Sequence, residues 1–139
     1  MSEYHFQYPI DIRYSDIDAQ GHVNNTKFSV YIESARLAYL TALGLWDGKT
    51  FLDLGVIVAD VHVAYKTPLF LGQKAVVNTR VAKIGNKSIQ FEFQIVNSEN
   101  GEVCATAETI NVAYDFKRET SIPVSDFWRQ TIQQFEHTV

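Results

Sequence analysis

The sequence of residues 25–43 is NTKFSVYIESARLAYLTAL, and its apolar residues recur at three- and four-residue steps. This spacing predicts one long amphipathic helix, because residues so spaced share one face of a helix. Asn24 or Asn25 is suited to cap the first turn, and Gly44 stands where helices commonly end in a left-handed residue. The apolar stripe contains small residues that allow close approach to a sheet; it comprises Phe28, Tyr31, Ile32, Ala35, Ala38, Tyr39 and Ala42.

Alternation of apolar and polar residues predicts β-strands on both sides of this helix. Gly85-Asn86 and Asn100-Gly101 are turn signals that join the last three strands into an antiparallel meander. Pro123 to His137 predicts a short C-terminal amphipathic helix, whose apolar side carries Phe127, Trp128, Ile132 and Phe135. The expected strands are Tyr8–Tyr14 before the long helix and Val56–Tyr65, Lys74–Ile84, Ser88–Asn97 and Glu102–Asp115 after it.

The order of these elements predicts an α+β fold. A single helix cannot cover both faces of a sheet, so we expect it to pack centrally on one face of a five-stranded antiparallel sheet. The chain of 139 residues suits a single domain, residues 1–139. Such a sheet has open edges, which proteins usually cover or pair. We therefore expect a homodimer or a homotetramer.

Composition excludes several classes of function. The net charge of −4, from 12 Lys+Arg and 16 Asp+Glu, argues against an electrostatic nucleic-acid binder. No apolar run approaches the ~18 residues that a membrane span requires, and the first ten residues lack the pattern of a signal peptide. Cys104 is the only cysteine, which favours a reducing cytoplasm, and we expect it to be a small buried residue.

Residues 13–25 read RYSDIDAQGHVNN and carry the candidate chemistry. Asp16 and Asp18 lie in a loop between a strand and the helix, and His22 follows four residues after Asp18. The first N–H groups of a helix lack intrahelical acceptors and carry partial positive charge, so they can hold an oxyanion. A carboxylate just upstream can act as general base or nucleophile. The arrangement suits transfer of an acyl group to water.

Other readings of the same residues remain open at this point. The two aspartates also fit a purely structural role, in which they shape a polar turn and cap neighbouring amides. A calcium loop fits poorly, because Lys27 stands where a bidentate glutamate is required. A zinc site from His22 and His62 has no support from their spacing. We expect no metal, and we expect His62 to be a partly buried strand residue.

Residues 14–36, YSDIDAQGHVNNTKFSVYIESAR, resemble the signature of the hotdog-fold acyl-CoA thioesterases, in the 4-hydroxybenzoyl-CoA thioesterase-like family. The combination of D-x-D-x-x-G-H-V-N-N with Glu-x-Ala-Arg carries the resemblance. It implies a hotdog fold and hydrolysis of an acyl-CoA substrate to a free acid and CoA, with no cofactor. The alternative is a non-catalytic hotdog protein that binds acyl-CoA. The motifs of hotdog dehydratases are not found.

The resemblance also implies roles for particular residues. Asp18, the second aspartate of the pair, matches the catalytic carboxylate, which acts as general base or nucleophile. The backbone N–H of Asn25 matches the group that polarises the thioester carbonyl. His22 belongs to the same segment and completes the set of catalytic candidates. Lys87 and Ser88 match a hairpin pair that contacts the nucleotide part of CoA.

Four further residues near the motif have expected roles. Asp16 is expected to brace the loop by accepting hydrogen bonds from the backbone or from Arg13. Tyr31 is expected to pack in the core. Glu33 and Arg36 stand three residues apart and are expected to pair on the helix surface. Glu33 is also a second candidate carboxylate, because some hotdog thioesterases use a helical glutamate.

Overall fold

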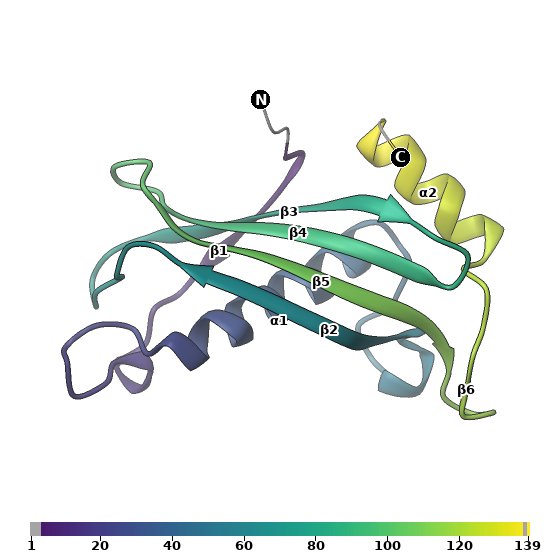
Figure 1. The fold of residues 1–139 in the computed structure, drawn as a ribbon, viewed down its shortest axis with the longest axis horizontal. Helices are drawn as coiled ribbons and strands as arrows, with labels where there is room; N and C mark the ends of the chain where they lie inside the picture. The colour runs from purple at the N-terminus through teal and green to yellow at the C-terminus, as the bar shows by residue number, and fades with distance from the viewer. Residues whose placement is uncertain (1–3, 138) are drawn as a thin grey trace.

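The computed structural model describes residues 4–137 and 139, and its elements follow the expected order (Figure 1). They are β1 (Phe6–Ile10), the 3₁₀ turn η1 (Tyr14–Asp16), α1 (Asn25–Ala42), the 3₁₀ turn η2 (Phe51–Asp53), β2 (Val56–Tyr65), β3 (Ala75–Ile84), β4 (Ser88–Asn97), β5 (Val103–Asp115), β6 (Thr120–Ser121) and α2 (Asp126–Glu136).

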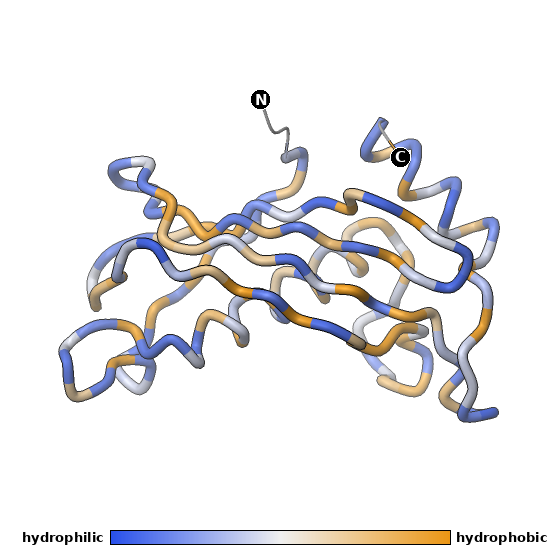
Figure 2. Tube along the Cα trace, viewed as in Figure 1, coloured by the Kyte–Doolittle hydropathy of each residue, from blue (hydrophilic) through white to orange (hydrophobic). Residues whose placement is uncertain are grey.

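The sheet has the strand order β1-β3-β4-β5-β2, and neighbouring strands are antiparallel. This confirms the expected five-stranded sheet, to which β6 adds a two-residue pairing with β5. Figure 1 shows α1 crossing one face of the sheet, and Figure 2 shows apolar and polar residues alternating along the strands. The strand β2 therefore lies at one edge of the sheet and β1 at the other.

The helix α1 begins and ends as its sequence predicts. The side chain of Asn24 accepts a hydrogen bond from the N–H of Thr26 at 2.9 Å, which caps the first turn. Gly44 follows the helix with a φ of +76°, the left-handed conformation expected there. The buried face differs from the predicted stripe at one end, because Leu40 is buried while Ala42 is exposed.

Three details of the prediction were wrong. The first strand lies earlier than Tyr8–Tyr14, because the chain leaves the sheet after Ile10 and residues 14–16 form the 3₁₀ turn η1. His62 is exposed rather than partly buried, since it belongs to the edge strand β2. Phe127 lies on the solvent side of α2 and is 62% exposed.

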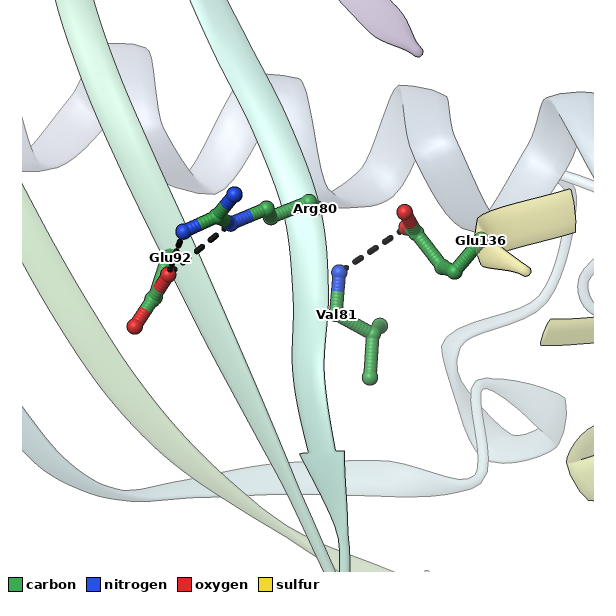
Figure 3. Close-up of polar contacts among 4 residues, drawn as sticks. All are labelled: Arg80, Val81, Glu92 and Glu136. Carbon is green, nitrogen blue, oxygen red and sulfur yellow. Dashed lines mark hydrogen bonds and ion pairs between the residues drawn. The ribbon is translucent and has the colours of Figure 1, made fainter. Parts of the chain in front are cut away.

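A buried carboxylate fixes α2 to the rest of the fold. Glu136, which is 2% exposed, accepts a hydrogen bond from the N–H of Val81 at 3.0 Å (Figure 3). It also accepts a hydrogen bond from the hydroxyl of Tyr39 at 2.6 Å. The strand β1 pairs with β3 only as far as Thr79, so Glu136 supplies an acceptor beyond the end of that ladder. Burial, followed by the contact with Glu136, raises the pKa of Tyr39 and keeps its hydroxyl a donor.

Glu136→Ala is expected to lower the free energy of unfolding by about 2–4 kcal/mol, because two buried donors lose their shared acceptor. Urea denaturation at pH 7 measures this loss. Gln134→Ala changes an exposed residue of the same helix and serves as the control. Equal losses in the two variants would show that Glu136 does not hold α2.

Candidate active site

Asp16 accepts hydrogen bonds that stabilise the loop before α1. Its carboxylate is 8% exposed, and Oδ2 accepts hydrogen bonds from the hydroxyl of Tyr31 at 2.7 Å and from the N–H of Arg13 at 3.1 Å. Its backbone carbonyl accepts from the N–H of Asn24 at 2.9 Å. The bracing role predicted for Asp16 is confirmed. Tyr31 is buried as expected, and its hydroxyl also secures the loop to the helix.

Asp18 begins a tight turn that ends at His22. The N–H of Asp18 donates to the carbonyl of His22, and the N–H of Gly21 donates to the carbonyl of Asp18, both at 3.0 Å. Gly21 has a φ of +85°, a conformation that a residue with a Cβ rarely adopts. The half-buried side chain of Asp18 accepts from the N–H of Gln20 through Oδ1. Within residues 4–137 and 139, Oδ2 has no hydrogen-bond donor.

A cleft of about 210 Å³ lies between the start of α1 and the end of β2. The ring of Tyr65 stacks on that of Phe28 at 5.5 Å, and the Tyr65 hydroxyl donates to the carbonyl of Asn25 at 3.3 Å. The N–H of Asn25, the first residue of the helix, has no acceptor in the described part of the chain. The cleft is lined by His22, Val23, Asn25, Phe28, Tyr65, Lys66, Thr67 and Pro68.

The three predicted catalytic candidates lie near the start of α1, but only two of them line the cleft. Asn25 and His22 line the cleft, and Asp18 lies beside it through its backbone hydrogen bond to His22. Nδ1 of His22 lies 3.3 Å from the carbonyl oxygen of Val23. The start of the helix offers a free donor and a partial positive charge to an oxyanion. The side chain of Asp18 is not among the groups that line the cleft.

Lys87 and Ser88 lie far from this cleft in the same chain. Ser88 pairs with Val112 of β5, which pairs with Ile57 near the start of β2. The cleft is at Tyr65, the other end of β2, about 25 Å away at the usual rise per strand residue. The structure of one chain therefore separates the two groups that the family resemblance associates with one substrate.

Two side chains in the cleft, Tyr65 and Lys66, were not predicted from the sequence. Tyr65 ends β2 and Lys66 follows it. Both lie more than twenty residues after α1, so no local pattern connects them to the motif. The prediction that Glu33 and Arg36 pair on the helix surface is wrong. Arg36 is buried, and no hydrogen bond or ion pair joins it to Glu33 among the residues described.

The remaining candidates are placed away from the cleft. Cys104 is buried as expected, and burial raises the pKa of its thiol. No three histidine, cysteine, aspartate or glutamate side chains in residues 4–137 and 139 are grouped so that they could bind a metal ion. In the same residues, no helix has the length and apolar character needed to cross a membrane.

Comparisons with known proteins agree with this arrangement. A sequence profile of the thioesterase-like superfamily matches residues 12–132. The chain is 23% identical over 128 residues to the long-chain acyl-CoA thioesterase FadM of Escherichia coli, covering 92% of this chain and 97% of that protein. It is 26% identical to the 1,4-dihydroxy-2-naphthoyl-CoA hydrolase of Synechococcus elongatus, covering 96% of this chain and 97% of the relative.

A solved structure gives the same result in three dimensions. A thioesterase from Thermus thermophilus, crystallised with coenzyme A and zinc, superposes with a TM-score of 0.84 and 28% sequence identity. The match covers 99% of this chain and 98% of the other. The predicted hotdog fold is therefore confirmed.

Tyr31→Phe is expected to lower the free energy of unfolding by about 1–3 kcal/mol, because the buried carboxylate of Asp16 loses one of its two donors. Chemical denaturation followed by far-UV circular dichroism measures the change. Tyr14→Phe removes a hydroxyl from an exposed tyrosine of the same loop and is the matched control. If both variants unfold at the wild-type denaturant concentration, the Tyr31 hydroxyl does not secure the loop.

Proposed function

The chain belongs to the thioesterase-like superfamily, and from this membership we propose that it hydrolyses acyl-CoA thioesters. In this reaction the C–S bond of the thioester breaks, the oxygen of water bonds to the acyl carbon, and a proton passes to sulfur. The products are a free acid and CoA. The relatives act on a long-chain acyl-CoA and on an aromatic acyl-CoA, so the shared chemistry is the thioester rather than one acyl group.

The observation that carries this proposal is the unpaired N–H of Asn25 in a cleft at the start of α1. We assign the thioester oxygen to this N–H, where the developing negative charge gains a hydrogen bond and the favourable end of the helix dipole. His22 lines the same cleft, and we assign its imidazole a position beside the reacting carbon.

We assign the carboxylate step to Asp18. Its Oδ1 is oriented by the N–H of Gln20, while Oδ2 is free to act on water or on the acyl carbon. As general base, Oδ2 takes a proton from the attacking water. As nucleophile, it bonds to the acyl carbon, the C–S bond breaks to release CoA as a thiolate, and water then opens the resulting anhydride. A single turnover in ¹⁸O-labelled water tests the second route, because ¹⁸O enters the Asp18 carboxylate only when water opens an anhydride at the aspartyl carbon.

We propose that the active form is a homodimer or a higher assembly that pairs the β2 edges. The edge of β2 is long, its register against β5 shifts between Val58 and Asp60, and it exposes Ile57, Val61 and Tyr65. A two-fold axis through such an edge places the start of one β2 beside the end of the other. The start of the partner's β2 and the β3–β4 hairpin near it then lie beside the cleft.

This pairing accounts for the distance between the cleft and the predicted nucleotide site. Lys87 and Ser88 of one protomer lie at the end of the sheet where the partner's cleft opens, so they can contact the phosphates of CoA there. The acyl group then lies between helix and sheet at the seam between protomers. We place the protein, as one domain, in the cytoplasm, where its buried Cys104 stays reduced.

Asp18→Asn is expected to keep the fold and lower turnover of acyl-CoA by at least about 100-fold, because the acid–base group is lost. Release of free CoA, followed with a thiol reagent, measures turnover on a panel of acyl-CoAs. Asp11→Asn, an exposed aspartate just before the loop, is the control. Near-normal turnover by Asp18→Asn would remove Asp18 from the mechanism. Binding of acyl-CoA by the wild type without release of CoA would indicate a non-catalytic binding protein.

Val61→Arg is expected to weaken self-association by at least about 100-fold, because two arginines meet across the paired edges. Size-exclusion chromatography with light scattering measures the assembly, and CoA release is expected to fall with it. Val30→Arg is the matched control: Val30 is 52% exposed against 51% for Val61, and it lines the cleft between α1 and β1 instead. An unchanged assembly in Val61→Arg would exclude the β2 edge as the interface.

A further inference from the structure

A second hollow lies beside the middle of α1, at the opposite end of β2 from the cleft. It has a volume of about 550 Å³ and an apolar wall formed by the turn η2, the start of β2 and Phe116. Ligand sites in proteins commonly have this size and character, with a few polar groups that orient the ligand. The polar lining side chains are those of Glu33, Arg36 and Thr50. We call this hollow the Arg36 groove.

The guanidinium of Arg36 is the unusual group in this groove. The residue is 7% exposed, and its Nε and Nη1 atoms are enclosed with no hydrogen-bond partner in the described part of the chain. Burial lowers the pKa of Arg36, although the nearby charge of Glu33 opposes this. A buried cation whose donors have no acceptors is costly. Because Arg36 lines the groove, an oxygen acceptor that reaches its guanidinium there gains a strong hydrogen bond.

The position of the groove connects it to the proposed reaction. Along α1, Arg36 lies about 16 Å from Asn25, at the usual rise of a helix. Under the proposed pairing of β2 edges, the Val56 end of one protomer lies beside the Tyr65 end of its partner. The Arg36 groove of one protomer then opens beside the partner's cleft, where the thioester is bound. An acyl group extending from that thioester enters the groove.

We propose that Arg36 selects acyl groups that carry an oxygen acceptor on the part farthest from the thioester. This inference rests on the proposed function and specifies its substrate class: a carboxylate, keto or hydroxyl oxygen receives the hydrogen bonds of the guanidinium. The apolar wall contacts the hydrocarbon part of the same group. An unsubstituted acyl chain fills the groove and leaves the guanidinium without an acceptor, so it binds less well.

The test compares plain, ω-hydroxy and ω-carboxy acyl-CoAs of matched lengths from six to twelve carbons. For the wild type, kcat/KM is expected to be about 10- to 100-fold higher for an oxygenated acyl-CoA than for its plain counterpart at the best length. Arg36→Met is expected to bring this ratio close to one, because kcat/KM falls for the oxygenated acyl-CoAs far more than for the plain ones. Arg80→Met removes an arginine that pairs with Glu92 outside the groove, and it is expected to keep the ratio.

A binding measurement adds a readout that does not depend on turnover. Free dicarboxylic acids of the same lengths are expected to raise the melting temperature of the wild type and of Arg80→Met, but not of Arg36→Met. If Arg36→Met does not fold, Arg36→Lys keeps the charge. It is expected to show an intermediate ratio of kcat/KM values, because lysine has a shorter side chain and a compact ammonium instead of the planar guanidinium.

Three results with Arg36→Met would overturn the proposal. They are an unchanged ratio in Arg36→Met, an equal loss for all substrates, and a change of that variant from dimer to monomer, which would assign the guanidinium to the interface. These differ from failure of the proposed function, in which the wild type releases CoA from none of the substrates. Hydrolysis of plain acyl-CoAs without any preference for oxygenated ones would overturn the role of Arg36 alone.

Discussion

Two tyrosines on α1 each donate to a buried carboxylate, and these bonds join the helix to the loop before it and to α2. Tyr31 donates to Asp16 of the preceding loop, and Tyr39, two turns further on, donates to Glu136 of α2. Apolar packing alone allows a helix to slide or turn over a smooth surface, because the hydrophobic effect has little direction. The two hydrogen bonds are directional, so they set the rotation and the position of α1. At the start of this helix, Asn25 lines the cleft beside the end of β2.

The candidate site combines hydrogen-bonded turns with polar groups that have no hydrogen-bond partner. The turn from Asp18 to His22 is held by backbone hydrogen bonds, and the first turn of α1 is capped by Asn24. By contrast, the free oxygen of Asp18 and the N–H of Asn25 have no protein partner in the described residues. Polar groups that the fold has oriented but not satisfied are the groups that a reacting molecule can use.

Local patterns in the sequence were sufficient for most elements and insufficient for contacts between distant segments. The strands 56–65 and 88–97 have the predicted bounds, because alternation and turn residues report directly on strands. The motif located Asp16, yet its bond to Tyr31 joins a loop to a helical residue whose ring suggests only packing. Arg36 was placed on the surface from its spacing to Glu33, whereas it is buried and lines a groove together with the turn η2 and the start of β2. The Asp16–Tyr31 hydrogen bond and the burial of Arg36 both depend on contacts between segments, which the periodicity of one segment does not predict.

The position of Glu136 late in the chain has a consequence for synthesis on the ribosome. The Tyr39 hydroxyl and the Val81 amide are made long before the carboxylate of Glu136, so a nascent chain that already contains the helix and the meander lacks the acceptor that both groups share in the folded domain. Full packing must wait until residue 136 has left the exit tunnel. Until then the nascent domain is a candidate client for chaperones that bind incompletely closed cores.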